Sequence, residues 1–367
     1  MPDQSILVIN TGSSSLKYGL YVDQNGEEKL QFGGSAQNGT IELKDSTDLV
    51  LRSEKLNFAS QAEALDHATQ WLREFTPDKP CAIGHRVVHG GPRLVAHQRI
   101  TPALIDELRS CVHFAPLHIP LALQLIERAE QCYPQIPQFA CFDTVFHRTM
   151  PEAATRFALP GELFDEGIRR YGFHGLSYES IVHQLADRLP SRTVIAHLGS
   201  GASLVAVKDG HSVDTTMALT PTAGIPMATR SGDLDPGILL YLLRVKQMNA
   251  DSLEQLLNHA SGLKALSGGT SDMRDLETAA DGGDPKAQLA IDIFCTSIRK
   301  TIAAYAAVLG GLDLLVFSGG IGEHSARIRN SVCEGLQFLG SFPVLVVPSQ
   351  EDRQIARHCR KLVNLPQ

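Results

Sequence analysis

Four polar residues stand in sequence contexts that suit chemistry on an anion. Arg86 interrupts the otherwise apolar run HRVVHGG, and it needs a buried anion as a partner because an unpaired arginine is rarely buried. Arg230 lies in the polar turn TRSGDLDPG, and His174 lies between two glycines in RRYGFHGLS. Asp143 belongs to the strand-like run FDTVFH. Guanidinium groups and an imidazole are side chains that can bind and stabilise an anion.

Structural roles remain open for several of these polar residues. Asp233 or Asp235 could pair with Arg230 while capping the helix that follows, and His174 could be a hydrogen-bonded core residue. Glu351 in SQEDRQ could bind a metal ion, or could simply favour the N-terminus of a helix.

A short theme, an apolar run broken by a Gly-Ser turn, occurs twice in the chain. Residues 6–15 read ILVINTGSSS and residues 194–203 read VIAHLGSGAS. A third segment, GGIGEHS at 319–325, follows a strand-like run and opens a helix. Such turns offer backbone N–H groups to phosphate oxygens. Neither a Walker A loop nor a G-x-G-x-x-G fingerprint occurs, so the repetition itself predicts two similar domains that hold a nucleotide between them.

Alternating strands and helices must position these residues. In the first half we expect strands at 6–10 and 16–22, alternating strand segments to about residue 58, a strand over 81–92 that ends in a Gly-Gly-Pro turn, and a strand at 138–147. We expect helices at 60–74, 102–110 and 118–132. In the second half we expect a hairpin over 194–209, strands at 211–219, 313–320 and 343–349, and helices at 235–247, 250–260, 284–310 and 351–363. This order predicts an α/β fold whose halves meet at a short hinge near 147–155.

The composition is typical of a globular protein and argues against nucleic-acid-binding and membrane-spanning classes. The 367 residues are 43% hydrophobic and 20% charged with a net charge of −7, which argues against a broad nucleic-acid surface. We expect no leader and no membrane span, because the chain opens directly on a strand-like run and no apolar stretch approaches ~20 residues. Seven scattered cysteines without a C-x-x-C pair predict reduced thiols in the cytoplasm. His85 and His89 are not a metal pair, because a strand separates them by ~13 Å.

Ordered segments along nearly the whole chain resemble the acetate kinase family, within the acetate and sugar kinase, Hsp70 and actin superfamily. The segments are NTGSSSLK, HRVVHGG, FAPLH, FDTVFH, RRYGFHG, HLGSGAS, TRSGDLDP, SDMRD and GGIGEHS. The resemblance implies two duplicated RNase H-like domains of the actin and Hsp70 type, with mixed sheets flanked by helices and the nucleotide in the interdomain cleft. We expect residues 1–147 with 353–367 in one domain and residues 148–352 in the other.

The family's activity implies reversible transfer of the γ-phosphoryl group of ATP to acetate by direct in-line displacement, giving acetyl phosphate and ADP. It implies Mg²⁺, with Mn²⁺ as an alternative, ATP and ADP as substrates, and a cytoplasmic homodimer joined through the second domain. It implies no nucleic-acid or membrane partner.

Matching positions carry the family's roles onto this chain. Arg86 matches the arginine of the substrate carboxylate, and Arg230 with His174 matches the pair that stabilises the transferring phosphoryl group. Asp143 matches the residue labelled as the catalytic acid/base. Acetate is already ionised at pH 7 and needs no general base, so we expect Asp143 to orient an arginine or the Mg²⁺ shell.

The remaining matched positions bind metal, acyl group or nucleotide. The metal positions are Asn10 and Glu351. The acyl-substrate positions are Val88, Leu117, His118, Phe173 and Pro221. The nucleotide positions are Ser13, Ser15, Lys17, His197, Leu198, Gly199, Ser200, Gly201, Asp272, Met273, Arg274, Gly320, Ile321, Gly322, Glu323 and His324.

The chain departs from the family's pattern at a few matched positions. Ser200 and His324 each replace an asparagine, Met273 replaces a phenylalanine, and Ile119 also replaces an asparagine. The segment TPTAG at 220–224 lacks the usual glutamate. These changes surround the nucleoside and the pocket rim, so they leave nucleotide preference open.

Three alternatives to the leading hypothesis remain. One is a covalent phospho-enzyme, and a second is a propionate or other short-chain carboxylate kinase. The third is an actin- or Hsp70-like ATP switch with a protein partner, since a fold does not fix a function.

Overall fold

The computed structural model describes residues 5–12 and 15–364, which form two compact units. Unit 1 contains the residues up to Val145, the segment Gly175–Ser180 and the residues from Gln350 onward. Unit 2 contains Phe146–His174 and Ile181–Ser349. The chain therefore passes between the units four times.

Unit 1 is built on an eight-stranded sheet. Its strands are β1 (Ile6–Thr11), β2 (Ser15–Gln24), β3 (Glu27–Gln37), β4 (Thr40–Asp45), β5 (Val50–Lys55), β6 (Ala82–Val87), β7 (Gln98–Arg99) and β8 (Gln138–Phe142), in the order β5-β4-β3-β2-β1-β6-β8-β7. Strands β1, β6 and β8 run parallel to one another, whereas β1 and β2 form an antiparallel pair. The carboxyl ends of β1, β6 and β8 therefore meet at one edge of the sheet.

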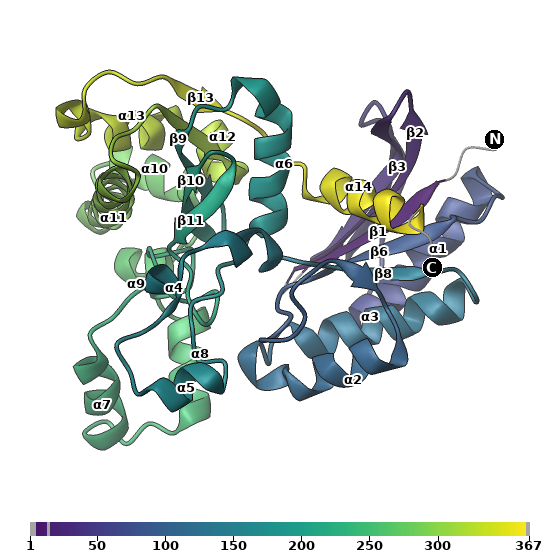
Figure 1. The fold of residues 1–367 in the computed structure, drawn as a ribbon, viewed down its shortest axis with the longest axis horizontal. Helices are drawn as coiled ribbons and strands as arrows, with labels where there is room; N and C mark the ends of the chain where they lie inside the picture. The colour runs from purple at the N-terminus through teal and green to yellow at the C-terminus, as the bar shows by residue number, and fades with distance from the viewer. Residues whose placement is uncertain (1–4, 13–14, 365–367) are drawn as a thin grey trace. The chain divides into compact units, whose positions relative to one another are not determined.

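Helices cover both faces of this sheet (Figure 1). They are α1 (Gln61–Phe75), α2 (Pro102–Ser110), α3 (Ile119–Cys132) and α14 (Glu351–Val363). Alternate side chains of β1 point to opposite faces, so Leu7 and Ile9 pack with α1 and α3, while Ile6 and Val8 pack with α14.

Unit 2 repeats the central pattern of unit 1. Its sheet contains β9 (Arg192–Leu198), β10 (Ala202–Lys208), β11 (His211–Thr215), β12 (Leu314–Ser318) and β13 (Val344–Val346), in the order β11-β10-β9-β12-β13. Two antiparallel pairings precede two parallel ones, as in β3-β2-β1-β6-β8 of unit 1. The predicted α/β fold with duplicated halves is confirmed.

The long helix α11 (Pro285–Leu309) packs on β9 and β10, and Asp284 caps it by accepting from Lys286 N. The other helices after β8 are α4 (Glu152–Thr155), α5 (Gly161–Asp165), α6 (Gly175–Leu185), α7 (Pro236–Arg244), α8 (Ala250–His259), α9 (Gly262–Ser267), α10 (Met273–Asp281), α12 (Gly319–His324) and α13 (Ala326–Glu334). Among the described residues, no helix is both long and apolar enough to span a bilayer.

Several predicted strands are shorter than expected. Those predicted at 313–320 and 343–349 form only Leu314–Ser318 and Val344–Val346. The strand predicted at 138–147 ends at Phe142, because the chain enters a 3-10 turn at Val145–Thr149. The strand predicted at 81–92 ends at Val87, before the left-handed turn at Gly91. The strand predicted at 211–219 ends at Thr215, since Arg170 takes the carbonyl oxygens of residues 215 and 216.

Candidate active site

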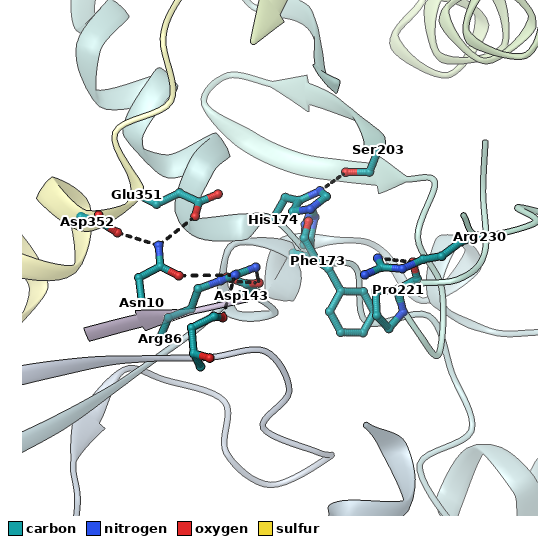
Figure 2. Close-up of polar contacts among 12 residues, drawn as sticks. Asn10, Arg86, Asp143, Phe173, His174, Ser203, Pro221, Arg230, Glu351 and Asp352 are labelled. Atoms are coloured by element: carbon teal, nitrogen blue, oxygen red, sulfur yellow. Dashed lines mark hydrogen bonds and ion pairs between the residues drawn. The ribbon is translucent and has the colours of Figure 1, made fainter. Parts of the chain in front are cut away.

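The shared strand edge of unit 1 brings three predicted site residues together. Asn10 and Arg86 are the penultimate residues of β1 and β6, and Asp143 follows β8 directly. Figure 2 shows Arg86 reaching both Asp143 and Asn10. Parallel strands that end together therefore place an arginine between a carboxylate and an amide.

Asp143 is the buried anion that the sequence requires for Arg86. Nη2 of Arg86 lies 2.6 Å from Oδ2 of Asp143, and Nε lies 3.1 Å from each carboxylate oxygen. Only 1% of the Asp143 side chain and 15% of the Arg86 side chain are exposed. Burial alone would lower the pKa of Arg86, but Asp143 and Glu351 outweigh it and raise that pKa, so the guanidinium stays charged. Burial raises the pKa of Asp143, and Arg86 opposes this rise.

Two carboxylates from the first turn of α14 converge on Asn10. Nδ2 of Asn10 donates to Asp352 Oδ1 at 2.6 Å and to Glu351 Oε2 at 3.2 Å, and its Oδ1 faces Arg86 at 3.4 Å. Burial raises the pKa of Asp352, and the neighbouring Glu351 raises it further. The two adjacent carboxylates are the hard oxygen donors that Mg²⁺ prefers, so they fit a divalent cation, whereas Asn10 turns its amide nitrogen toward them. Sequence reasoning chose Glu351 and missed Asp352, although both acids are visible in SQEDRQ.

The other predicted residues of unit 1 lie in varied environments. Lys17 is exposed on β2, directly opposite Asn10 in the antiparallel register. Ser15 begins β2, whereas Ser13 lies outside the described residues. The acyl-pocket candidates of this unit are Val88, buried just after β6, Leu117, which is 43% exposed, and His118, at the N-cap of α3.

In unit 2, His174 is held by a hydrogen bond at the edge of its ring and by a neighbouring ring. Its Nδ1 lies 2.9 Å from the hydroxyl of Ser203, a fully buried residue of β10 (Figure 2). The ring of His197, on β9, lies 4.5 Å away between centroids. His174 also adopts a left-handed backbone conformation with φ of 57°. The imidazole is thus oriented by a neighbour that the sequence reading did not single out, Ser203.

The open face of Gly201 is the point on which His174 and Arg230 converge. A Cβ atom at Gly201 would lie 3.3 Å from Nε2 of His174 and 3.5 Å from Nη1 of Arg230. Nη1 of Arg230 also donates to the carbonyl oxygen of Pro221 at 3.2 Å. Phe173, which precedes His174, is buried within unit 2. Two nitrogen donors therefore border a space that only a glycine leaves open, which suits an anion.

A cavity of about 610 Å³ in unit 2 is lined by residues from three of the segments predicted to bind nucleotide, 197–201, 272–274 and 320–324. Its lining residues are Gly199, Ser200, Ser271, Asp272, Met273, Arg274, Glu277, Gly320, Ile321, His324 and Ser325. Ser325 ends the predicted segment 319–325. Ser271 and Glu277 were not predicted as binding residues, and their side chains carry no sequence signal that separates them from ordinary surface residues.

Several predicted nucleotide residues have structural roles within this region. Asp272 caps α10 and forms an ion pair with Arg274 at 2.6 Å. Oε1 of Glu323 accepts from Gly319 N at 2.9 Å. Nδ1 of His324 donates to the carbonyl oxygen of Gly320 at 3.0 Å. His197, Leu198 and Gly322 are not among the residues that line the cavity.

The chain matches known proteins along nearly its whole length. A model of the acetokinase family matches residues 5–357. The acetate kinases of Treponema denticola and Methylocella silvestris are each 40% identical to it over 98% of this chain, covering 99% and 98% of those proteins. Crystal structures of a Francisella tularensis propionate kinase and the Porphyromonas gingivalis acetate kinase superpose with TM-scores of 0.90 and 0.87, at 34% and 32% identity. Both superpositions cover 98% of this chain and 100% of the other. The chain belongs to the acetokinase family.

Proposed function

We propose that this protein reversibly transfers the γ-phosphoryl group of ATP to acetate, giving acetyl phosphate and ADP. One observation carries the proposal: the loop at 199–201 joins the nucleoside cavity to the point where His174 and Arg230 converge. A nucleotide whose base lies in the cavity can then extend its phosphates along this loop. The two nitrogen donors stabilise charge on the transferring group.

The residues of unit 1 supply the acceptor side of the proposed reaction. Arg86 binds the carboxylate of acetate, and Asp143 orients its guanidinium rather than acting as a base, because acetate is ionised at pH 7. Asn10, Glu351 and Asp352 hold Mg²⁺ or Mn²⁺. The ion, when bound, neutralises charge on the nucleotide's terminal phosphates.

Propionate is the second candidate acceptor, because the Francisella tularensis structure bears that name. An extra methylene in an apolar pocket changes discrimination by only ~1–3 kcal/mol. We therefore expect partial selectivity among short carboxylates, with acetate preferred.

A homodimer in the cytoplasm completes the proposal. Apolar side chains of α7, namely Ile238, Leu240, Tyr241 and Leu243, are between 38% and 50% exposed. An exposed apolar stripe of this kind supports association of two copies through unit 2. Light scattering at micromolar concentration tests the dimer, and a monomer would refute it.

The decisive test is a coupled assay of ATP turnover with acetate, propionate and butyrate, with Arg86→Ala as control. We expect a maximum of kcat/KM at acetate, loss of turnover when Mg²⁺ is chelated, and a raised KM for acetate in Arg86→Ala. A maximum at propionate would reassign the acceptor. ATP turnover that ignores every carboxylate would favour a nucleotide switch.

Stereochemistry separates direct transfer from the phospho-enzyme route. ATP with a chiral γ-phosphorus should give acetyl phosphate with inverted configuration. Net retention would require two displacements and would exclude the in-line mechanism.

A further inference from the structure

Three titratable side chains that the proposed reaction does not use meet inside unit 1. His97 precedes β7, Glu179 lies on α6 and His358 lies on α14. Nε2 of His358 is 2.6 Å from Oε2 of Glu179, and Nε2 of His97 is 3.6 Å from the same oxygen. The two rings lie 4.0 Å apart, and 9–17% of each side chain is exposed. We call His97, Glu179 and His358 the α6 clamp.

The clamp contains the residue types of a metal site, but the ring of His97 carries its proton on the nitrogen that a metal would need. All three ligand atoms lie within 4.8 Å of one another. However, the backbone N–H of Phe142 donates to Nδ1 of His97 at 3.0 Å, so the neutral ring carries its proton on Nε2. A metal-bound histidine has the opposite arrangement, with its second nitrogen donating a proton outward. Nε2 of His97 therefore has no lone pair for a cation and directs its proton toward Glu179.

The clamp contacts a short stretch of α6, residues 175–180, that belongs to unit 1 although its neighbours in sequence belong to unit 2. Gly175 N donates to the carbonyl oxygen of Asp143 at 2.9 Å, and Gln350 N donates to Ser180 Oγ at 3.1 Å. Glu179 adds a second side-chain attachment to these two hydrogen bonds. The first turn of α6 is thus fixed to β8 and α14 together.

His174 is joined to this turn by one peptide bond and is itself held in a left-handed conformation. We propose that Glu179 is a positioning residue for phosphoryl transfer, fixing the first turn of α6 and thereby the backbone from which His174 reaches the reacting phosphate. This inference rests on the proposed function of His174. Its chemistry is that of a buried carboxylate hydrogen-bonded to one imidazole, that of His358, with Nε2 of His97 3.6 Å from the same oxygen.

His358 has a second partner available on its own helix. Its Nε2 also lies 3.0 Å from Nε2 of Gln354, one turn earlier on α14. One ring nitrogen cannot accept from Gln354 and donate to Glu179 at the same time. Burial would raise the pKa of Glu179, but the hydrogen bond from His358 and the nearby imidazole of His97 hold it at about 2, so the carboxylate is charged and favours the donating state. Without that charge, His358 can turn to Gln354 and release α6.

The test compares two glutamates that tie other elements to α14. Glu179→Gln removes the charge that holds α6, whereas Glu28→Gln removes the charge that pairs with Arg360 and holds β3. Both variants should unfold at lower temperature. Only Glu179→Gln should lower kcat, by about 10-fold, with KM for acetate and ATP within about twofold, because His174 acts in the transition state. Hydrogen exchange should quicken at the amides of 176–180 in that variant alone.

Each outcome decides between named alternatives. A wild-type kcat in folded Glu179→Gln, or an equal loss of kcat in Glu28→Gln, would overturn the positioning role. Stoichiometric Zn²⁺ binding that requires His97 would overturn the protonation argued for the clamp. If His174→Ala retains full kcat, the proposed function of that residue fails instead. The hydrogen-exchange comparison still tests the attachment of α6 in that case.

Discussion

Gly201→Ala probes the reacting point of unit 2 with a single methyl group. The added Cβ would lie 3.3 Å from Nε2 of His174 and 3.5 Å from Nη1 of Arg230, so His174 must retreat by a few tenths of an ångström. An oxygen bound by both donors would lie about 2.7–3.1 Å from each, close to the volume that the methyl fills. The variant therefore displaces the donors and obstructs the anion between them.

The expected cost falls on catalysis more than on folding. The nearest atoms to the new methyl are side-chain ends that can yield, so we expect about 1 kcal/mol or less of lost stability. Loss of the donors' geometry should lower kcat about 10²-fold, equivalent to about 2.7 kcal/mol. Initial rates at saturating acetate and ATP measure this loss, and urea unfolding measures stability.

Gly161→Ala is the matched control, because no atom lies within 4 Å of its added Cβ. It should retain the wild-type kcat. A wild-type kcat in folded Gly201→Ala would refute the assignment of the reacting point. A raised KM for ATP with unchanged kcat would instead assign Gly201 to ground-state nucleotide binding.

Three further predictions concern the residues that support the site. Asp143→Asn removes the charge of the only carboxylate that lies within hydrogen-bond distance of Arg86 among the described residues. The free energy of unfolding, measured in urea, should therefore fall by about 3 kcal/mol. The same variant should lose kcat yet keep normal Mg²⁺ dependence, and a new pH dependence of kcat would contradict an orienting role for Asp143. Ser203→Ala removes the hydroxyl 2.9 Å from Nδ1 of His174 and should lower kcat about 10-fold, whereas an unchanged kcat would show that the ring is held without it. Because the pKa of Glu179 lies at about 2 instead of 4.5, its stabilising effect is full above pH 4.5 and lost as the pH falls toward 2. Urea titrations should therefore find wild type about 3 kcal/mol more stable than Glu179→Gln at pH 7 and equally stable near pH 2, and a pH-independent difference would be inconsistent with this linkage.

The sequence was sufficient for the duplicated fold and for the residues of the strand edge. Apolar runs predict β1, β6 and β8, and the polar residues Asn10, Arg86 and Asp143 lie at or just beyond the carboxyl ends of these strands. A parallel sheet then brings those endings together without any further information. Local patterns are informative here because the strands and their order repeat in both halves.

Other features depend on contacts that no local pattern contains. Helix α6 begins without a side-chain cap, and its first N–H is bound by the distant carbonyl of Asp143. The choice of Asp352 beside Glu351 depends on where Asn10 stands after β1 has paired. The convergence of His174 and Arg230 on Gly201 joins three separate loops. Such long-range arrangements follow from tertiary packing, so sequence spacing alone cannot specify them.

The placement of α14 on unit 1 has a consequence for synthesis of the protein on the ribosome. Ile6 and Val8 emerge early, but the helix that covers them, with Ile355 and Cys359, follows roughly 350 residues later. At about 5–20 residues per second, one face of the first sheet stays uncovered for roughly 20–70 s. Unit 2 can complete its own sheet in that interval, since β9 to β13 all precede α14. Newly made chains should thus need chaperone protection at the face of β1, and acquire their carboxylate pair beside Asn10 only when that face closes.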